Sequence, residues 1–222
     1  MTAALGLLTF LNPCIMKSYR NSKVILVCFV ILALTGFRSE PGDSDFYIVN
    51  TQQSTVAWTG YYAFNFNEHT GTIRLTKGEI EVAGNRITGG FFELDMNSIE
   101  DVDMRGESSA KDLEEHLKSD DFFSVAQYPT ARFTITKTKD VQGGPINYEI
   151  TGTLTLKGIT NTLTFPATVA IKDGQLQATA KLKFDRTRWN VRYNSGKIFS
   201  SIGDGAISDA IALEIHLSAR PC

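Results

Sequence analysis

Residues 148–166 read YEITGTLTLKGITNTLTFP, a stretch in which apolar and polar side chains alternate. Ile150, Leu154 and Leu156 share this period of two, which is the pattern of a β-strand with one buried face. Lys157-Gly158 is a turn signal, and the alternation resumes after it. The stretch therefore predicts two consecutive strands of an antiparallel sheet.

The same alternation recurs through most of the chain, with turn signals between its segments. It predicts about eight strands in an antiparallel sandwich or barrel. Along residues 72–82 the apolar positions change phase at Lys77-Gly78, which predicts a bulge or bend in a long strand. Coiled strands with bulges favour a barrel. One short helix is expected at residues 107–119, where Leu113 and Leu117 share a face.

Composition and charge restrict the class of protein further. The chain has 222 residues, of which 42% are hydrophobic and 21% are charged, as in one ordinary globular domain. Its formal net charge of -2 leaves no excess of Lys and Arg to neutralise phosphates. We therefore expect an all-β domain and no nucleic-acid partner.

Residues 1–40 have the layout of a secretory signal peptide. A basic segment ending at Lys23 precedes the apolar run of residues 24–34, and Met16 opens a neater signal peptide than the first Met does. The run is about half of the roughly 20 residues that span a bilayer, so no stable membrane span is expected. The remaining residues, 41–222, are predicted to form a single periplasmic or secreted domain.

The predicted inward positions alternate between small side chains and phenylalanines. A barrel lined in this way has room for one elongated apolar ligand. The same residues could instead interdigitate in a dry core, and the pattern leaves both arrangements open. The small positions are Gly89, Gly152, Ala167, Ala178 and Ala180, and the aromatic ones are Phe91, Phe133, Phe165 and Phe184.

Four motifs follow one another in the second half of the chain. A His-Leu with a following Asp-Phe-Phe begins at His116, and a Tyr-Pro begins at Tyr128. A G-x-L-T-x-x-G-x-T turn begins at Gly152, and an arginine-containing loop begins at Arg186. In this order the motifs resemble those of the YceI-like family, over about residues 46–219. The resemblance implies an extended, lipocalin-like antiparallel barrel, usually periplasmic, whose apolar pore in some members holds a polyisoprenoid or related amphiphile.

The expected ligand-binding residues combine these motifs with the inward strand positions. Arg186 either clamps an anionic headgroup or forms a structural ion pair with Asp185. His116, the Phe122-Phe123 pair and Trp189 serve either ligand contact or packing. The full set is Phe91, His116, Phe122, Phe123, Phe133, Ala178, Ala180, Phe184, Arg186 and Trp189.

No metal or cofactor is expected from the sequence. His69, His116 and His216 are isolated along the chain, and we find no dinucleotide fingerprint, phosphate-binding loop or nucleophile elbow.

The expected function is that of an exported, non-enzymatic protein that carries or sequesters a long apolar amphiphile. The candidate ligands are a polyisoprenoid, an isoprenoid quinone or a similar lipid. One alternative is a barrel isomerase or cyclase in which Glu93 or Asp185 acts as acid or base and Arg186 polarises a lipid substrate. Another is an interaction module without a pore ligand. The oligomeric state, a dimer included, stays open.

Overall fold

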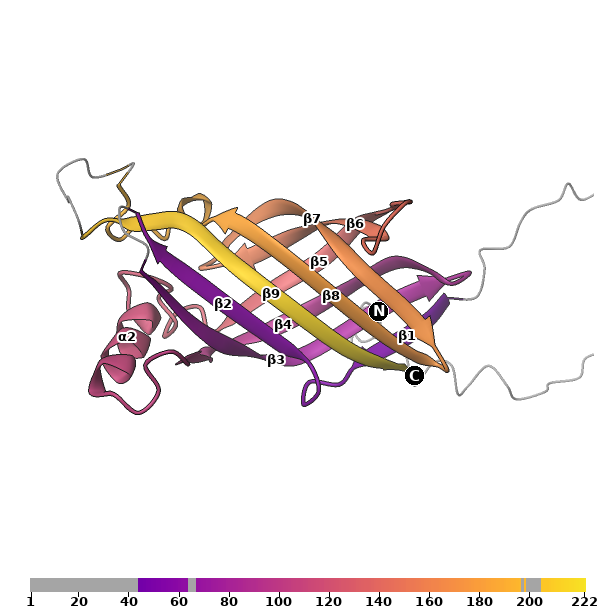
Figure 1. The fold of residues 1–222 in the computed structure, drawn as a ribbon, viewed down its shortest axis with the longest axis horizontal. Helices are drawn as coiled ribbons and strands as arrows, with labels where there is room; N and C mark the ends of the chain where they lie inside the picture. Colours follow the sequence, from indigo (N-terminus) through magenta and orange to yellow (C-terminus); the bar gives the residue numbers. More distant parts are fainter. Residues whose placement is uncertain (1–43, 64–66, 197, 199–204) are drawn as a thin grey trace, which may run out of the picture.

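The computed structural model describes residues 44–63, 67–196, 198 and 205–222. The leader predicted at residues 1–40 lies outside these residues. The described chain forms an antiparallel barrel with a short helix at one end, as Figure 1 shows. None of its helices has the length and apolar character that crossing a bilayer requires.

Nine strands make up the wall of the barrel in the described part of the chain. They are β1 (Ser44–Val49), β2 (Thr55–Tyr62), β3 (Glu68–Ala83), β4 (Arg86–Asp101), β5 (Thr130–Asp140), β6 (Tyr148–Leu156), β7 (Ile159–Lys172), β8 (Gln175–Asp185) and β9 (Ile207–Pro221).

The barrel closes because its first two strands share one place in the wall. β1 and β2 both pair with β3 on one side and with β9 on the other. From β3 to β9, each strand pairs antiparallel with the next. Nine strands with one shared place give a ring of eight, which confirms the predicted barrel of about eight strands.

The β6–β7 hairpin has the turn that its sequence predicts. Leu156 pairs with Ile159, and the two residues between them have positive φ, 50° at Lys157 and 73° at Gly158. Positive φ at both central positions characterises the type I′ turn, whose twist matches that of the flanking strands. A Cβ at Gly158 would also lie 2.7 Å from the Tyr128 ring. Glycine is therefore required here by conformation and by space.

The predicted phase change in the long third strand is confirmed as a bulge. In the β3–β4 pairing, Leu75 lies opposite Leu94 and Lys77 lies opposite Glu93, so the register shifts by one residue between them. Leu75 is buried before the bulge and Ile80 is buried after it. The extra residue keeps both halves of the strand facing the interior.

The one helix with an α conformation in the described chain, α2 (Ser108–Lys118), lies within the predicted range of residues 107–119. It packs at one end of the barrel, next to β4 (Figure 1). Ala110 is its buried residue, while Leu113 and Leu117 line a cavity inside the barrel. A short 3-10 helix, η1 (Arg186–Trp189), follows β8.

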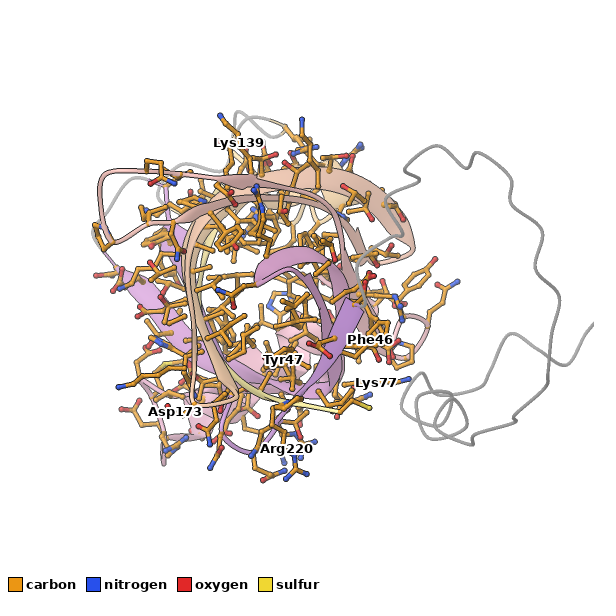
Figure 2. The ribbon with its side chains drawn as sticks, turned by 90° about the vertical axis from the view of Figure 1, so that its right-hand side faces the viewer. Phe46, Tyr47, Lys77, Lys139, Asp173 and Arg220 are labelled. Atoms are coloured by element: carbon orange, nitrogen blue, oxygen red, sulfur yellow. The ribbon has the colours of Figure 1, made fainter. Side chains whose placement is uncertain are left out.

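The opposite end of the barrel holds both ends of the described chain. Tyr47 of β1 pairs with Pro221 of β9, and the Cys222 N–H donates to the Phe46 carbonyl oxygen at 2.8 Å. Seen from this end, Tyr47 points into the ring of strands (Figure 2). Its side chain is buried and fills this end of the core.

Candidate ligand-binding site

The barrel interior contains two apolar cavities. The first has a volume of about 180 Å³ and is lined from α2 and the neighbouring strand ends, so we name it the helix-side cavity. The second, the distal cavity, has a volume of about 110 Å³ and lies towards the other end. Four residues line both cavities, Val56, Leu94, Leu154 and Leu213. The two spaces therefore adjoin along the inside of the barrel.

Both linings are almost entirely apolar. In the distal cavity Thr179 is the one polar residue among the described lining residues, and it belongs to the exposed phase of β8, as Gln177 does. In the helix-side cavity the polar or amphipathic lining residues are Tyr61, Tyr62, His69, Arg186 and Ser208. A cavity with so few polar partners does not hold ordered water well, and apolar cavities of this kind stay dry or take up apolar molecules.

Side chains that line unfilled space lose packing contacts on that side. An apolar ligand in the two cavities would restore such contacts. The barrel interior is thus only partly packed, which favours the hollow arrangement over a fully interdigitated core.

The structure brings seven of the ten expected ligand-binding residues to the two cavities. The side chains of Phe122, Phe123, Phe184 and Arg186 line the helix-side cavity. Those of Phe133, Ala178 and Ala180 line the distal cavity.

The placement of Phe91 differs from the expected one. The Arg132 guanidinium lies 4.1 Å from the centre of the Phe91 ring and the Lys77 Nζ lies 5.4 Å from it, on the outer face of the barrel. The neighbouring Phe92 lines the distal cavity instead. Two adjacent phenylalanines fit either phase of the alternation, so the sequence could not distinguish them. Gly89 shares the outward phase, because a Cβ there would meet Glu81.

Trp189 and His116 lie behind the cavity lining. Trp189 is completely buried, and its ring packs edge-on against Phe184 at 5.2 Å between centroids. The His116 ring packs edge-on against Phe122 at 5.0 Å and against Tyr193 at 4.6 Å. Phe184 and Phe122 do line the helix-side cavity, so the geometry gives Trp189 and His116 packing roles behind them.

Arg186 is engaged by the protein itself. Its side chain is 1% exposed. Burial lowers the pKa of its guanidinium, and the nearby Asp209 and Asp185 act in the opposite direction. Its nitrogens donate to the backbone carbonyl oxygens of four residues, Val191, Tyr193, Ile207 and Ser208, at 2.8–3.2 Å.

This arrangement bears on both roles expected for Arg186. The guanidinium ties the η1 loop to the start of β9, and its bonds to carbonyl oxygens leave it poorly placed to clamp a headgroup. The carboxylate nearest to it is that of Asp209, whose Oδ1 lies 3.8 Å from the Arg186 Nη2. Asp185 accepts instead from the backbone N–H and the hydroxyl of Thr187, at the start of the 3-10 helix.

Neither of the two carboxylates considered for acid–base chemistry is among the residues that line the cavities. Glu93 forms an ion pair with Arg132, beside the outward-facing Phe91. Asp185 accepts hydrogen bonds from Thr187, as described above. Among the described residues, no Asp or Glu lines either cavity. The described lining residues therefore offer no carboxylate to a bound lipid.

A cluster that the sequence does not reveal lies at the helix-side end. His69 Nδ1 is 3.0 Å from Asp103 Oδ2, and one carboxylate oxygen of Asp101 lies near both residues. The expectation that His69 is isolated is therefore wrong, because strand pairing brings residues more than 30 positions apart together. The Asp-x-Asp spacing at residues 101–103 was the one local signal of such a cluster. Its histidine partner, His69, could be identified only from the register of β3 against β4.

Electrostatics differ between the two carboxylates of this cluster. Burial raises the pKa of the Asp101 carboxyl, although the Met104 N–H donates to it. For Asp103, burial acts in the same direction, but hydrogen bonds from the Thr70 N–H and from His69 hold the pKa of its carboxyl below the usual value. The better hydrogen-bonded carboxylate is thus the more acidic one.

Comparison with known proteins agrees with this architecture. A model of the YceI-like domain matches residues 47–219. A UPF0312 protein of Shewanella denitrificans is 31% identical over 134 residues, which cover 54% of this chain and 60% of that protein. One from Pseudomonas putida strain W619 is 32% identical over 110 residues, 50% of this chain and 54% of that protein. The chain thus matches little more than half the length of these curated relatives.

Two solved structures share the fold. BcnA of Burkholderia cenocepacia is 22% identical, with a TM-score of 0.60 over 77% of this chain and 98% of that one. A polyisoprenoid binding domain from Saccharophagus degradans, implicated in plant cell wall breakdown, is 14% identical, with a TM-score of 0.59 over 79% of this chain and 98% of that one. At such identities the likeness shows the fold alone. The family model, however, covers nearly the whole barrel, and the chain belongs to the YceI-like family.

Proposed function

We propose that the protein is an exported, non-enzymatic carrier or sequestering protein that holds the chain of one long apolar amphiphile inside its barrel. The observation that supports this most is the pair of adjoining apolar cavities. Together they form an elongated space with few polar groups, which suits a flexible hydrocarbon chain better than a compact polar metabolite.

The proposed ligand class is a polyisoprenoid, an isoprenoid quinone or a similar lipid. The apolar distal cavity suits the hydrocarbon tail. Tyr62 and His69 line the other cavity and would offer polar atoms to a headgroup. The domain of the same fold from Saccharophagus degradans is a polyisoprenoid binding domain, which supports this choice of class.

The proposed contact residues follow from the two linings. His116 and Trp189 act by holding the aromatic side chains in front of them. Arg186 acts by anchoring the loop beside the helix-side cavity. Direct contacts with the ligand are proposed for Phe122, Phe123, Phe133, Ala178, Ala180 and Phe184.

A carrier is favoured over a barrel isomerase or cyclase. General acid–base catalysis needs a titratable group within hydrogen-bonding reach of the reacting atoms. Glu93 is paired with Arg132, and Asp185 is hydrogen-bonded to Thr187, and neither is a cavity-lining residue. This geometry supports binding without chemical conversion.

Export from the cytoplasm is part of the proposal and rests on the leader pattern of residues 1–40. The protein would then work in the periplasm or outside the cell. N-terminal sequencing of the mature protein should give a start between Gly36 and Asp45. Soluble cytoplasmic protein that still carries Met16 would contradict export.

The carrier proposal is tested by what the protein retains and what it binds. Protein purified from its native compartment is expected to release a lipid on organic extraction and to show its mass in native mass spectrometry. The Ala178→Phe and Ala180→Phe variants fill the distal cavity, so each should bind a polyprenol or long-chain quinone about tenfold more weakly or worse.

A matched control adds the same ring to the other face of the strand. Gln177 is exposed on β8, next to Ala178, so Gln177→Phe should leave lipid binding unchanged. Wild-type protein that retains no lipid and binds none of these probes would overturn the proposed function. Equal binding by the Ala178, Ala180 and Gln177 variants would move the ligand out of the distal cavity.

A further inference from the structure

We name three residues the His69 cluster: His69, Asp101 and Asp103. They meet where β3 begins and the neighbouring strand β4 ends. His69 lies near the start of β3, Asp101 is the last residue of β4, and Asp103 follows in the next turn. The pairing of Gly71 with Asp101 sets this register, and the Val102 N–H donates to the Thr70 carbonyl oxygen at 2.8 Å. The cluster therefore rests on strand backbone rather than on a long loop.

The three side chains present their ligand atoms to one common point. One nitrogen of His69 and one carboxylate oxygen of each aspartate lie within 4.8 Å of one another. His69 Nδ1 and Asp103 Oδ2 are 3.0 Å apart. Ligand atoms about 2.0–2.2 Å from a shared metal ion lie roughly 3–3.5 Å from each other, so small rotations of the side chains suffice.

The surroundings already fix the two aspartates. The Thr70 N–H donates to Asp103 Oδ1 at 2.5 Å, and the Met104 N–H donates to Asp101 Oδ1 at 2.8 Å. Each carboxylate thus accepts from the backbone with its Oδ1, and Asp103 places its Oδ2 3.0 Å from His69 Nδ1. Such supporting hydrogen bonds are typical of carboxylates that ligate metals.

An independent observation points to a missing partner. Asp101 is only 1% exposed, and its Oδ2 has no hydrogen-bond donor among the described residues. A buried carboxylate oxygen without a partner is costly, and a bound cation would remove that cost. The neighbouring helix increases the negative charge, because Glu114 of α2 accepts from the Asp101 N–H at 2.9 Å.

We infer that His69, Asp101 and Asp103 bind one divalent transition-metal ion, with Zn²⁺ as the expected species, at the helix-side end of the barrel. One imidazole and two carboxylates form a three-ligand set of the kind that leaves a coordination position open for water. Calcium and magnesium prefer six or more oxygen ligands and do not seek imidazole. Asp103 is 33% exposed, which gives the ion a route from solvent.

The test uses the full chain without a histidine tag, stripped with a chelator and titrated with ZnCl₂ in a calorimeter. Saturable binding of one ion per chain is expected for the wild type, with a rise in melting temperature. His69→Gln and the isosteric Asp101→Asn each remove a proposed ligand, so each should weaken binding by more than about tenfold, the lower end of what losing a group that only supports a ligand typically costs.

The control is another histidine–carboxylate pair on the same molecule. His216 Nε2 lies 3.1 Å from Glu214 Oε1 on the outer wall, so His216→Gln should leave zinc binding unchanged. Co²⁺ titration of the wild type gives an answer that does not depend on the folding of any variant. Visible d–d bands of a low-coordinate site without a thiolate charge-transfer band are expected.

Three outcomes would overturn the inference. The first is no saturable binding of Zn²⁺ to the wild type. A proton shared between the Asp101 and Asp103 carboxylates would then supply the hydrogen bond that Asp101 Oδ2 lacks. The second is a thiolate band in the cobalt spectrum, which would place the ion on cysteine. The third is equal affinity in folded His69→Gln and wild-type protein. Because His69 also lines the helix-side cavity, lipid binding is measured separately, on wild-type protein stripped of metal, so that failure of the metal site and failure of the carrier proposal are distinguishable.

Discussion

The indole N–H of Trp189 donates a hydrogen bond of 2.9 Å to the backbone carbonyl oxygen of Leu154, a residue 35 positions earlier in the chain. This bond fixes the 3-10 helix to the middle of the barrel wall. Leu154 also lines both cavities. A single completely buried side chain thus connects the loop after β8 to the residues between the two cavities.

Replacing Trp189 tests that connection. Trp189→Phe keeps a ring but leaves the buried Leu154 carbonyl oxygen without its donor, at about 1–3 kcal/mol of folding free energy. Trp189→Ala also opens a cavity behind Phe184 and should cost about 3–5 kcal/mol. Urea denaturation monitored by circular dichroism measures both values. An unchanged midpoint in the alanine variant would show that the indole does not support the barrel.

Arg186→Gln should destabilise the protein without changing its preference for lipid charge. The substitution leaves several buried carbonyl oxygens without donors and leaves Asp209 without the facing cation, at about 3–5 kcal/mol. Arg188→Gln is the matched control: that side chain is exposed and donates to the Thr162 carbonyl oxygen, so its loss should cost less than about 1 kcal/mol. Thermal unfolding and binding of neutral and phosphorylated lipids are the measurements. Selective loss of the phosphorylated lipid would restore Arg186 as a headgroup clamp.

Gly152→Ala should destabilise the barrel by overpacking. A Cβ at this position would lie 2.3 Å from the Phe133 ring and 2.5 Å from the Thr134 carbonyl oxygen, and the backbone atom cannot move away easily. We expect a cost of about 1–3 kcal/mol. Gly60→Ala, also in a strand, has no atom within 4 Å of the added methyl group and should be neutral or mildly stabilising. Equal unfolding midpoints for the two variants would contradict the predicted contact.

Lys157→Met should loosen the segment that follows α2. The Lys157 Nζ donates to the carbonyl oxygens of Asp120 and Phe122, at 3.0 and 2.6 Å, and so holds Phe122 against the helix-side cavity. Without these bonds, amide hydrogen exchange in residues 120–125 should speed up and bound lipid should leave faster. Lys139→Met, at an exposed ion pair with Glu149, serves as the control. Unchanged exchange and release would show that the segment is held by packing alone.

Local patterns allowed the wall of the barrel to be predicted, because strand phase and turn chemistry are encoded within a few residues. The turn at Lys157-Gly158 and the bulge near Lys77 were both found in this way. The inner and outer faces were predicted correctly where one apolar residue alternates with polar ones. They could not be assigned at Phe91 and Phe92, where both phases look the same.

The candidate site was only partly predictable because it depends on pairing over long distances. Small residues such as Ala178 indicated room inside the barrel, but its division into two adjoining cavities follows from packing in three dimensions. The partners of Arg186 are backbone carbonyl oxygens, which carry no signal in a sequence. The His69 cluster needs the register of β3 against β4, and no local pattern fixes it.

The meeting of β1 with the end of β9 determines how the protein can be attached to a support or a fusion partner. The first and last residues of the described chain lie at the end of the barrel away from α2 (Figure 1). A tether at either of them therefore leaves the α2 end of the barrel free. Linking the two ends and cutting an exposed turn such as that at Asp173-Gly174 should preserve the barrel, because the join would follow an existing strand contact.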